Sequence, residues 1–491
     1  MACTTILVGK KASYNGSTLI ARNDDSPSGV FCAKKLVVIE PSKQPRKYKS
    51  KIAHLKIDLP DNPLRYTSMP SVDKSEGVWA AAGINSANVG MTATETITTN
   101  PRVMGADPLV VYQPKSKGKK EVPGGIGEED LVVLTLPYIT SARQGVMRLG
   151  SLLEKYGTYE ANGIAFNDKD EVWWLESIGG HNWIACKVKD EEVVIMPNQF
   201  GLDKFDFNDA YEAQNENICS RGLKDLVENN FLDLSRNKEE FNPRLAFGSH
   251  DDSDHVYNTP RAWYMGRYLT NKSIKWDGSE ARYTPLSDDI PWSLIPDTKV
   301  TIEDIKYLLS SYYQGTPYTP YSKVNDPLKG IYRPIGISRT SFLAILEIRN
   351  NVKKEYSAIE WVSFGSNAFN AIVPLYTNTS VIPTYFTNTT SEVNTNNFYW
   401  VSRLIGALAD SHFNLCSVFI ERYQNTALNK GHELLNKYDA LLNSSSDTLN
   451  LINKANKEVE EMIKKETNKA LDKILYTVSC QMKNGYNRSD N

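Results

Sequence analysis

Short β-rich stretches recur in pairs through the first half of the chain, and a few polar residues join the two members of each pair. Connections this short join antiparallel strands, because parallel strands need a crossover of about a dozen residues or more. The pattern therefore predicts antiparallel sheets built from hairpins. The expected pairs are residues 4–8 with 17–21 across the two-residue turn Asn15-Gly16, 77–84 with 89–94, 163–166 with 171–175, and 183–188 with 193–196.

Helical periodicity appears between these hairpins and again near the C-terminus. Residues 129–156 carry apolar side chains three and four apart, and Pro260 suits the first turn of a helix that continues through Tyr268. Between Ile452 and Val478 the apolar residues fall on one helical face, with Lys and Glu around them. Antiparallel strands interleaved with long helices predict an α+β sandwich, in which two sheets face each other and helices cover the outside.

The charge balance and the hydropathy pattern exclude several classes of protein. The 56 Lys and Arg residues nearly equal the 58 Asp and Glu residues, so we expect no nucleic acid partner. No run of about eighteen apolar residues is present, so we expect no membrane span. The apolar stretch at residues 1–8 is short and lacks the basic segment and cleavage site of a signal peptide, which favours a cytoplasmic protein.

The six cysteines are scattered, and none forms a C-x-x-C pair, so the sequence indicates neither a zinc knuckle nor a thioredoxin-type site. Cys3 is distinguished by its position. If the residues before it are removed, its α-amine lies within reach of its own thiol. An α-amine has a pKa of about 7.7–8.0, so it can act as the general base without a histidine. The alternative is that Cys3 only begins an edge strand.

Charged residues follow the second strand of the first hairpin. The hairpin returns Arg22 and Asp25 to the neighbourhood of Cys3. A guanidinium beside a thiol stabilises the thiolate, and a carboxylate can hold an amine. The alternative is an exposed turn of mixed charge.

A second group of polar residues, His250-Asp251-Asp252-Ser253-Asp254-His255, has the side chains of a zinc or manganese site. The spacing is not H-E-x-x-H, and no helical pattern surrounds it. We favour a structural loop that borders the pocket. His181, beside two glycines, is expected to be structural or to face the substrate rather than to act as a base.

Cys3-Thr4-Thr5 followed by Ala21-Arg22-Asn23-Asp24-Asp25 resembles the start of the bacterial dipeptidase A family, which belongs to the N-terminal-nucleophile (Ntn) hydrolases. The resemblance continues in order along almost the whole chain. It covers residues 82–85, 91–96, 124–130, 173–176, 179–181, 196–199, 247–255, 257–261 and 332–336.

This resemblance implies an αββα sandwich of two antiparallel sheets flanked by helices, and broad, metal-independent hydrolysis of dipeptides without a cofactor. Distant relatives include bile-salt hydrolases and penicillin V acylases. We expect an Ntn-hydrolase peptidase domain over residues 3–400. A helical C-terminal extension over 401–491 would pack on that domain or on another subunit of a homo-oligomer. Two alternatives remain, namely hydrolysis of another amide (an N-acyl amino acid or a conjugated bile acid) and a non-catalytic binding protein that keeps the fold.

The residue roles that the resemblance implies can be placed one by one. Cys3 matches the nucleophile, Arg22 the arginine near the sulfur, Asp25 the carboxylate that holds the α-amine, Asn198 the amide of the oxyanion hole, and Arg261 the late arginine of the same network. Because that α-amine is free only after the Ala2–Cys3 bond is cut, we expect the Cys3 thiol to cut it.

One position departs from the family pattern. Where the relatives have an asparagine after the second hairpin, this chain has Thr94-Glu95-Thr96. An ionised carboxylate has no proton to donate, so we expect a backbone N–H to be the second oxyanion donor. Glu95 would instead hold the ammonium group of the substrate, and Thr94 and His181 would line the substrate site. The alternative for Glu95 is a surface glutamate.

Overall fold

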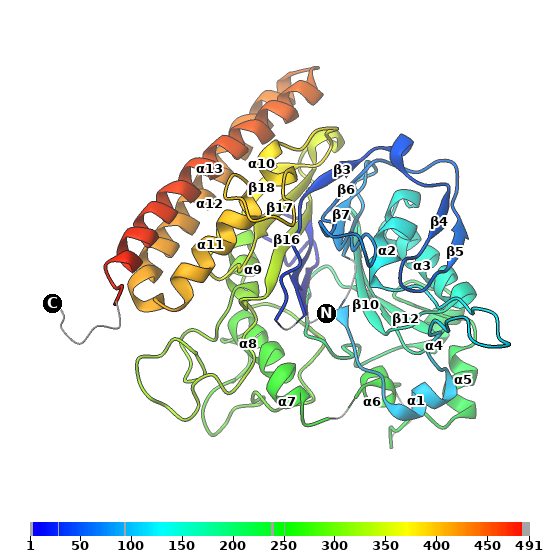
Figure 1. Ribbon diagram of the computed structural model, residues 1–491. Helices are drawn as coiled ribbons and strands as arrows, with labels where there is room; N and C mark the ends of the chain where they lie inside the picture. Colours follow the sequence, from blue (N-terminus) through cyan, green and yellow to red (C-terminus); the bar gives the residue numbers. More distant parts are fainter. Residues whose placement is uncertain (1–2, 28, 93–94, 237–239, 250, 484–491) are drawn as a thin grey trace.

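The computed structural model describes residues 3–27, 29–92, 95–236, 240–249 and 251–483, and two seven-stranded antiparallel sheets form its centre (Figure 1). The first sheet has the order β15 (Ser293–Leu294), β13 (Val193–Met196), β1 (Thr4–Val8), β2 (Thr18–Asp25), β16 (Thr340–Ile348), β17 (Ala358–Phe364) and β18 (Val373–Tyr376). The second has the order β14 (Asn217–Cys219), β12 (Trp183–Val188), β11 (Val172–Ser177), β10 (Asn162–Asn167), β8 (Gly90–Thr92) and β7 (Ala82–Ile84), and β9 (Glu95–Thr96) also pairs with β10.

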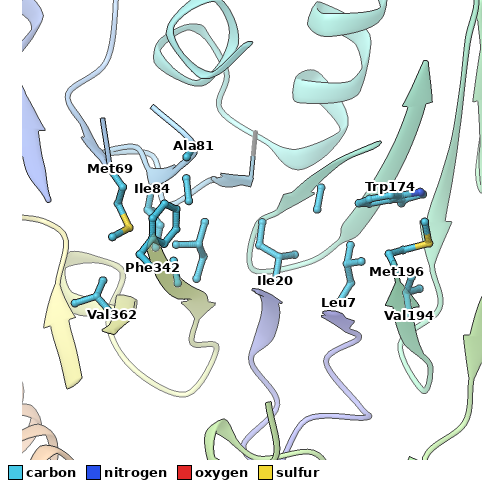
Figure 2. Close-up of a cluster of buried hydrophobic side chains, with 14 of the residues drawn as sticks. Leu7, Ile20, Met69, Ala81, Ile84, Trp174, Val194, Met196, Phe342 and Val362 are labelled. Atoms are coloured by element: carbon cyan, nitrogen blue, oxygen red, sulfur yellow. The ribbon is translucent and has the colours of Figure 1, made fainter. Parts of the chain in front are cut away.

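Apolar side chains fill three layers, one between the sheets and one on the outer face of each. Side chains alternate between the faces of a strand, so on β1 Leu7 points to the other sheet while Ile6 and Val8 point outward. Figure 2 shows Leu7 and Val194 of the first sheet in the inner layer with Trp174 of the second. These strands are buried on both faces, which explains their nearly continuous apolar sequences.

Helices cover both outer faces. The first sheet packs against α8 (Thr259–Leu269), α9 (Ile302–Leu309) and α12 (Phe413–Ser444), and the second against α2 (Glu128–Thr135) and α3 (Ala142–Tyr156). Next to α12 lie α11 (Phe398–Asp410) and α13 (Thr448–Ser479), which reach β17 and β18 (Figure 1). The predicted αββα sandwich with a helical C-terminal region is confirmed.

Shorter elements connect these layers. They are the helices α1 (Pro101–Ala106), α4 (Phe207–Tyr211), α5 (Leu223–Asn229), α6 (Pro243–Phe247), α7 (Asp254–Tyr257) and α10 (Thr384–Thr387), and the two-stranded sheets β3 (Val37–Ile39) with β6 (Tyr66–Ser68) and β4 (Lys47–Lys49) with β5 (Lys56–Asp58). Among the described residues, none of the helices combines the length and apolar composition needed to cross a membrane.

Three of the four predicted strand pairs are confirmed, namely β1–β2, β7–β8 and β10–β11. Asn15-Gly16 is only the end of the first connection, which spans residues 9–17 rather than two residues. The fourth pair is wrong. Despite the short link at 189–192, β12 pairs with β11 and β14, while β13 pairs with β1 and β15 in the other sheet. Both strands are apolar on both faces, so their alternation does not specify a partner.

The helical predictions hold with one interruption. The stretch 129–156 is two helices, because Pro137 lies in a single 3-10 turn after α2 and has no N–H to continue the helical hydrogen bonds. The second helix then begins after Ser141, whose side chain accepts a hydrogen bond from the Gln144 N–H. Pro260 lies in the first turn of α8, and 452–478 lie within α13, as predicted.

Candidate active site

The register of the first sheet brings three distant segments together at Cys3. On one side of β1, Thr4 pairs with Asn23 and Thr5 with Arg22. On the other side, Thr5 pairs with Met196 of β13, so the chain leaves β13 towards Asn198 beside Cys3. The chain passes from β12 of the second sheet to β13 of the first, and this passage places Asn198 next to Cys3.

Cys3 is fully buried, and its thiol faces a guanidinium. Arg22 Nη2 lies 2.7 Å from Cys3 Sγ and 3.1 Å from Asp24 Oδ1. Arg22 and Asp24 are two residues apart on β2, so both side chains point to the same face of the strand. Lys34 Nζ lies 3.4 Å from Asp24 Oδ2 and adds a second buried cation. A guanidinium this close to sulfur favours the thiolate form.

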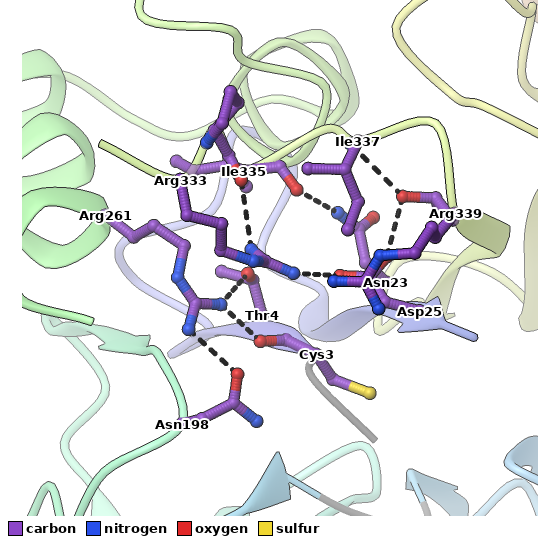
Figure 3. Close-up of polar contacts among 12 residues, drawn as sticks. Cys3, Thr4, Asn23, Asp25, Asn198, Arg261, Arg333, Ile335, Ile337 and Arg339 are labelled. Carbon is purple, nitrogen blue, oxygen red and sulfur yellow. Dashed lines mark hydrogen bonds and ion pairs between the residues drawn. The ribbon is translucent and has the colours of Figure 1, made fainter. Parts of the chain in front are cut away.

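Arg261, in the first turn of α8, joins the backbone of Cys3 to Asn198 (Figure 3). Its Nη1 donates to the Cys3 carbonyl at 2.5 Å and to Thr4 Oγ1 at 2.7 Å, and its Nη2 donates to Asn198 Oδ1 at 2.8 Å. Because the arginine holds Oδ1, the Asn198 amide is fixed with Nδ2 on the side away from Arg261. That Nδ2 donates to the Thr96 carbonyl at 3.1 Å.

Asn258, which was not among the predicted site residues, holds the backbone of Asn198 by hydrogen bonds. Its Oδ1 accepts from the Asn198 N–H at 3.1 Å, and its Nδ2 donates to the Asn198 carbonyl at 3.1 Å. The same Oδ1 accepts from Arg261 Nη2 at 2.6 Å, and Asp254 accepts a further hydrogen bond from Nδ2. Asn258 thus holds both Asn198 and Arg261 in place. Its place three residues before Arg261, in the same helical turn, was the available signal.

Asp25 lies on the opposite face of β2 from Arg22, as the alternation of the strand requires. Its Oδ1 accepts from Thr340 Oγ1 at 2.6 Å, and Arg333 forms an ion pair with its Oδ2. Both partners are distant in sequence and were not expected. The assignment of Asp25 to the α-amine stays a prediction.

The remaining predicted residues are spread more widely. His181 is about half exposed and contacts Asp107, with 3.4 Å between Nδ1 and Oδ1. His255 contacts Asp288, while Asp254 accepts from Ser249 Oγ at 2.9 Å and supports Asn258, so these two residues face different partners. His250, Thr94 and the side chain of Glu95 lie outside the described part of the chain. Their proposed roles stay predictions.

Glu128, at the N-terminus of α2, places an acidic group near the thiol. It was not among the predicted site residues. Only 2% of the residue is exposed, and its Oε1 lies 3.5 Å from Arg22 Nη2. Burial raises the pKa of its carboxyl group to about 7. Cys3, Asp24 and Glu128 each offer a ligand atom within 4.8 Å of the others, the spacing of a cation site. Because Arg22 contacts all three groups, a metal ion there would have to displace the guanidinium.

A cavity of about 550 Å³ adjoins this region without containing the thiol. Gln199 and Asp254 line it, so it borders the Asn198 loop and the support of Asn258. Its other walls carry both acidic and basic side chains, among them Arg244 and Asp203. The cavity therefore lies next to the candidate site and is not lined by Cys3.

Residues 2–426 of the chain match peptidase family C69. The chain belongs to this family. Over the full length of both chains it is 49% identical to a dipeptidase of Bifidobacterium longum strain NCC 2705 and 49% identical to a probable dipeptidase A of Streptococcus pyogenes serotype M3. It is 43% identical to dipeptidase A of Lactobacillus helveticus, with 89% of this chain and 88% of that protein covered. The resemblance inferred from the sequence is confirmed.

Proposed function

We propose that this member of family C69 hydrolyses a broad range of dipeptides, with Cys3 as an N-terminal nucleophile. The observation that carries the proposal is the contact of 2.7 Å between Arg22 Nη2 and Cys3 Sγ, because a guanidinium beside the sulfur favours the thiolate. Membership of a peptidase family and the names of the relatives support the same reaction.

The proposal includes a maturation step. The Cys3 thiol attacks the carbonyl carbon of Ala2, the peptide nitrogen leaves as the α-amine of Cys3, and water hydrolyses the resulting thioester. The amine that this step releases is then the general base of turnover.

Turnover uses the same sulfur. The α-amine takes the thiol proton, and sulfur attacks the carbonyl carbon of the dipeptide. The oxyanion accepts hydrogen bonds from Asn198 Nδ2 and a backbone N–H. The amine passes its proton to the leaving amino group as the C–N bond breaks. Water, deprotonated by the same amine, then attacks the thioester, which releases the first amino acid and restores the thiol.

The test is a substrate panel measured with purified protein. It compares dipeptides with tripeptides, N-acyl amino acids and a conjugated bile acid, each with and without a chelator and a small thiol alkylator. A Cys32→Ser/Cys480→Ser protein is the suitable form, because it lacks the two cysteines that are not buried. Of those that remain, burial raises the pKa of the Cys186, Cys219 and Cys416 thiols, whereas Arg22 favours the reactive thiolate of Cys3. Dipeptides should be hydrolysed despite the chelator, and alkylation should abolish the activity.

Other outcomes would contradict the proposal in distinct ways. Preference for an acylated amino acid or bile acid would change the substrate class. Loss with chelator and recovery with one divalent ion would replace the thiol mechanism by a metal mechanism. Hydrolysis of nothing in the panel would favour a binding protein.

A further inference from the structure

Glu128 comes from the opposite layer of the sandwich yet reaches the nucleophile. It begins α2, which covers the second sheet, whereas Cys3 precedes β1 of the first. One of its carboxylate oxygens lies within 4.8 Å of Cys3 Sγ. The Glu128 N–H donates to Glu160 Oε1 at 2.6 Å, and this bond fixes the start of the helix. The position of the carboxylate is therefore set by contacts outside the nucleophile strand.

The covalent geometry of a dipeptide matches this position. The α-nitrogen of its first residue lies about 2.5 Å from the carbonyl carbon that the sulfur attacks, as standard bond lengths require. Sulfur approaches that carbon to about 3–3.5 Å before reaction. The α-ammonium then lies on the order of 3–5 Å from Sγ, and a charged hydrogen bond from it spans about 2.7–2.9 Å. A carboxylate oxygen within 4.8 Å of Sγ can accept that bond while the sulfur attacks.

We propose that Glu128 receives the α-ammonium group of the substrate and is the residue by which the enzyme recognises a free N-terminus. This inference rests on the proposed dipeptidase function. It also moves the ammonium contact from Glu95, for which the sequence suggested it, to a residue whose distance from the thiol is known.

The other carboxylate at the thiol is less suited to this role. Asp24 contacts two buried cations, Arg22 at 3.1 Å and Lys34 at 3.4 Å. Glu128 lies further from Arg22, at 3.5 Å, and the helix holds it from the other side of the site. If Glu128 served only to orient Arg22, its substitution would affect every substrate equally, with or without an α-amine.

The experiment compares Glu128→Gln with the wild type on a matched pair of substrates, alanyl-alanine and propionyl-alanine, which differ by the α-amine. The substitution removes a hydrogen bond between charged groups, so kcat/KM for the dipeptide should fall about 10- to 100-fold, mainly through KM. The value for propionyl-alanine should change less than about threefold. If propionyl-alanine is hydrolysed too slowly to measure, its inhibition constant in competition with alanyl-alanine is compared between the variants instead of kcat/KM.

Two variants serve as controls. Glu129→Gln alters the next carboxylate, which accepts from Tyr159 and Ser50 instead, and should keep the wild-type preference between the two substrates. Glu95→Gln tests the rival ammonium contact. If Glu95→Gln loses the preference and Glu128→Gln keeps it, the inference is overturned.

The pH dependence of the wild-type enzyme tests the same inference without a variant. Burial raises the pKa of the Glu128 carboxyl group to about 7. Cys3, Arg22, Asp24 and Glu160 lie around this group. Once protonated, the carboxyl group has no negative charge to balance an ammonium ion. The ratio of kcat/KM for alanyl-alanine to that for propionyl-alanine should therefore fall as pH drops through about 7. The Cys3 amine acts on both substrates and cancels in this ratio.

The outcomes separate the two proposals. If the wild type hydrolyses dipeptides but Glu128→Gln loses equal activity on both substrates and the ratio is independent of pH, the inference fails and the dipeptidase function stands. If the wild type hydrolyses no dipeptide, both fail. A dipeptide-specific loss with a pH-dependent ratio supports Glu128 as the ammonium site.

Discussion

Cys3→Ala should lose dipeptide hydrolysis by at least about ten-thousandfold, since removal of a catalytic nucleophile has effects of that order or larger. The substitution deletes the only sulfur that Arg22 contacts among the described residues, and water cannot form the acyl intermediate. Cys3→Ser keeps a nucleophilic atom at the same place but should retain less than about 1% of the activity, because an alkoxide is harder to generate than a thiolate. Initial rates with a saturating dipeptide measure both.

The control is Cys416→Ala, which removes a fully buried cysteine from α12, far along the chain from the site. It should keep activity near the wild-type level. If Cys3→Ala protein that is folded, as judged by its unfolding transition, hydrolyses dipeptides at more than about a hundredth of the normal rate, Cys3 is not the nucleophile.

Asn198→Ala should lower kcat about 100- to 1000-fold, the usual effect of removing one oxyanion donor. Arg261 holds Oδ1 at 2.8 Å and Asn258 clamps the backbone, so Nδ2 is preorganised before substrate arrives. Asn198→Asp is the sharper variant. It keeps the acceptor for Arg261 but replaces the amide donor by a group without a proton, and its loss should be at least as large. Steady-state kinetics on one dipeptide measure both variants.

A loss of kcat below about tenfold in both variants would place Asn198 outside the oxyanion hole. A loss in Asn198→Ala alone would mean that the residue acts by holding Arg261 rather than by donating a hydrogen bond. Unfolding transitions near that of the wild type show that either effect comes from chemistry.

The layers of the fold were predictable because their signals are local. Alternation and short polar links specify hairpins, and β1 lies at residues 4–8, as expected. The proximity of Cys3 and Arg22 was equally predictable, since the β1–β2 pair brings Arg22 beside the start of β1. The apolar alternation and the pairing of β1 with β2 both involve residues close together in the sequence, so the first hairpin could be predicted.

Long-range pairing could not be read in the same way. A link at 189–192 is short enough for a hairpin, yet β13 pairs with β1 of the other sheet. Glu128 was missed for a related reason. Glu128-Glu129-Asp130 has the composition of a solvated first turn of a helix, where acids favour the helix dipole. In the structure all three are buried.

The mass of intact, active enzyme tests the central claim, that catalysis uses the α-amine of Cys3, most directly. A nitrogen in a peptide bond is not basic, so the amine is available only when the Ala2–Cys3 bond has been cut. We predict that fully active protein has the mass of a chain that begins at Cys3, and that folded Cys3→Ala protein retains Ala2. Fully active wild-type enzyme that still carries Ala2 would contradict the N-terminal-nucleophile mechanism and require a separate base for Cys3.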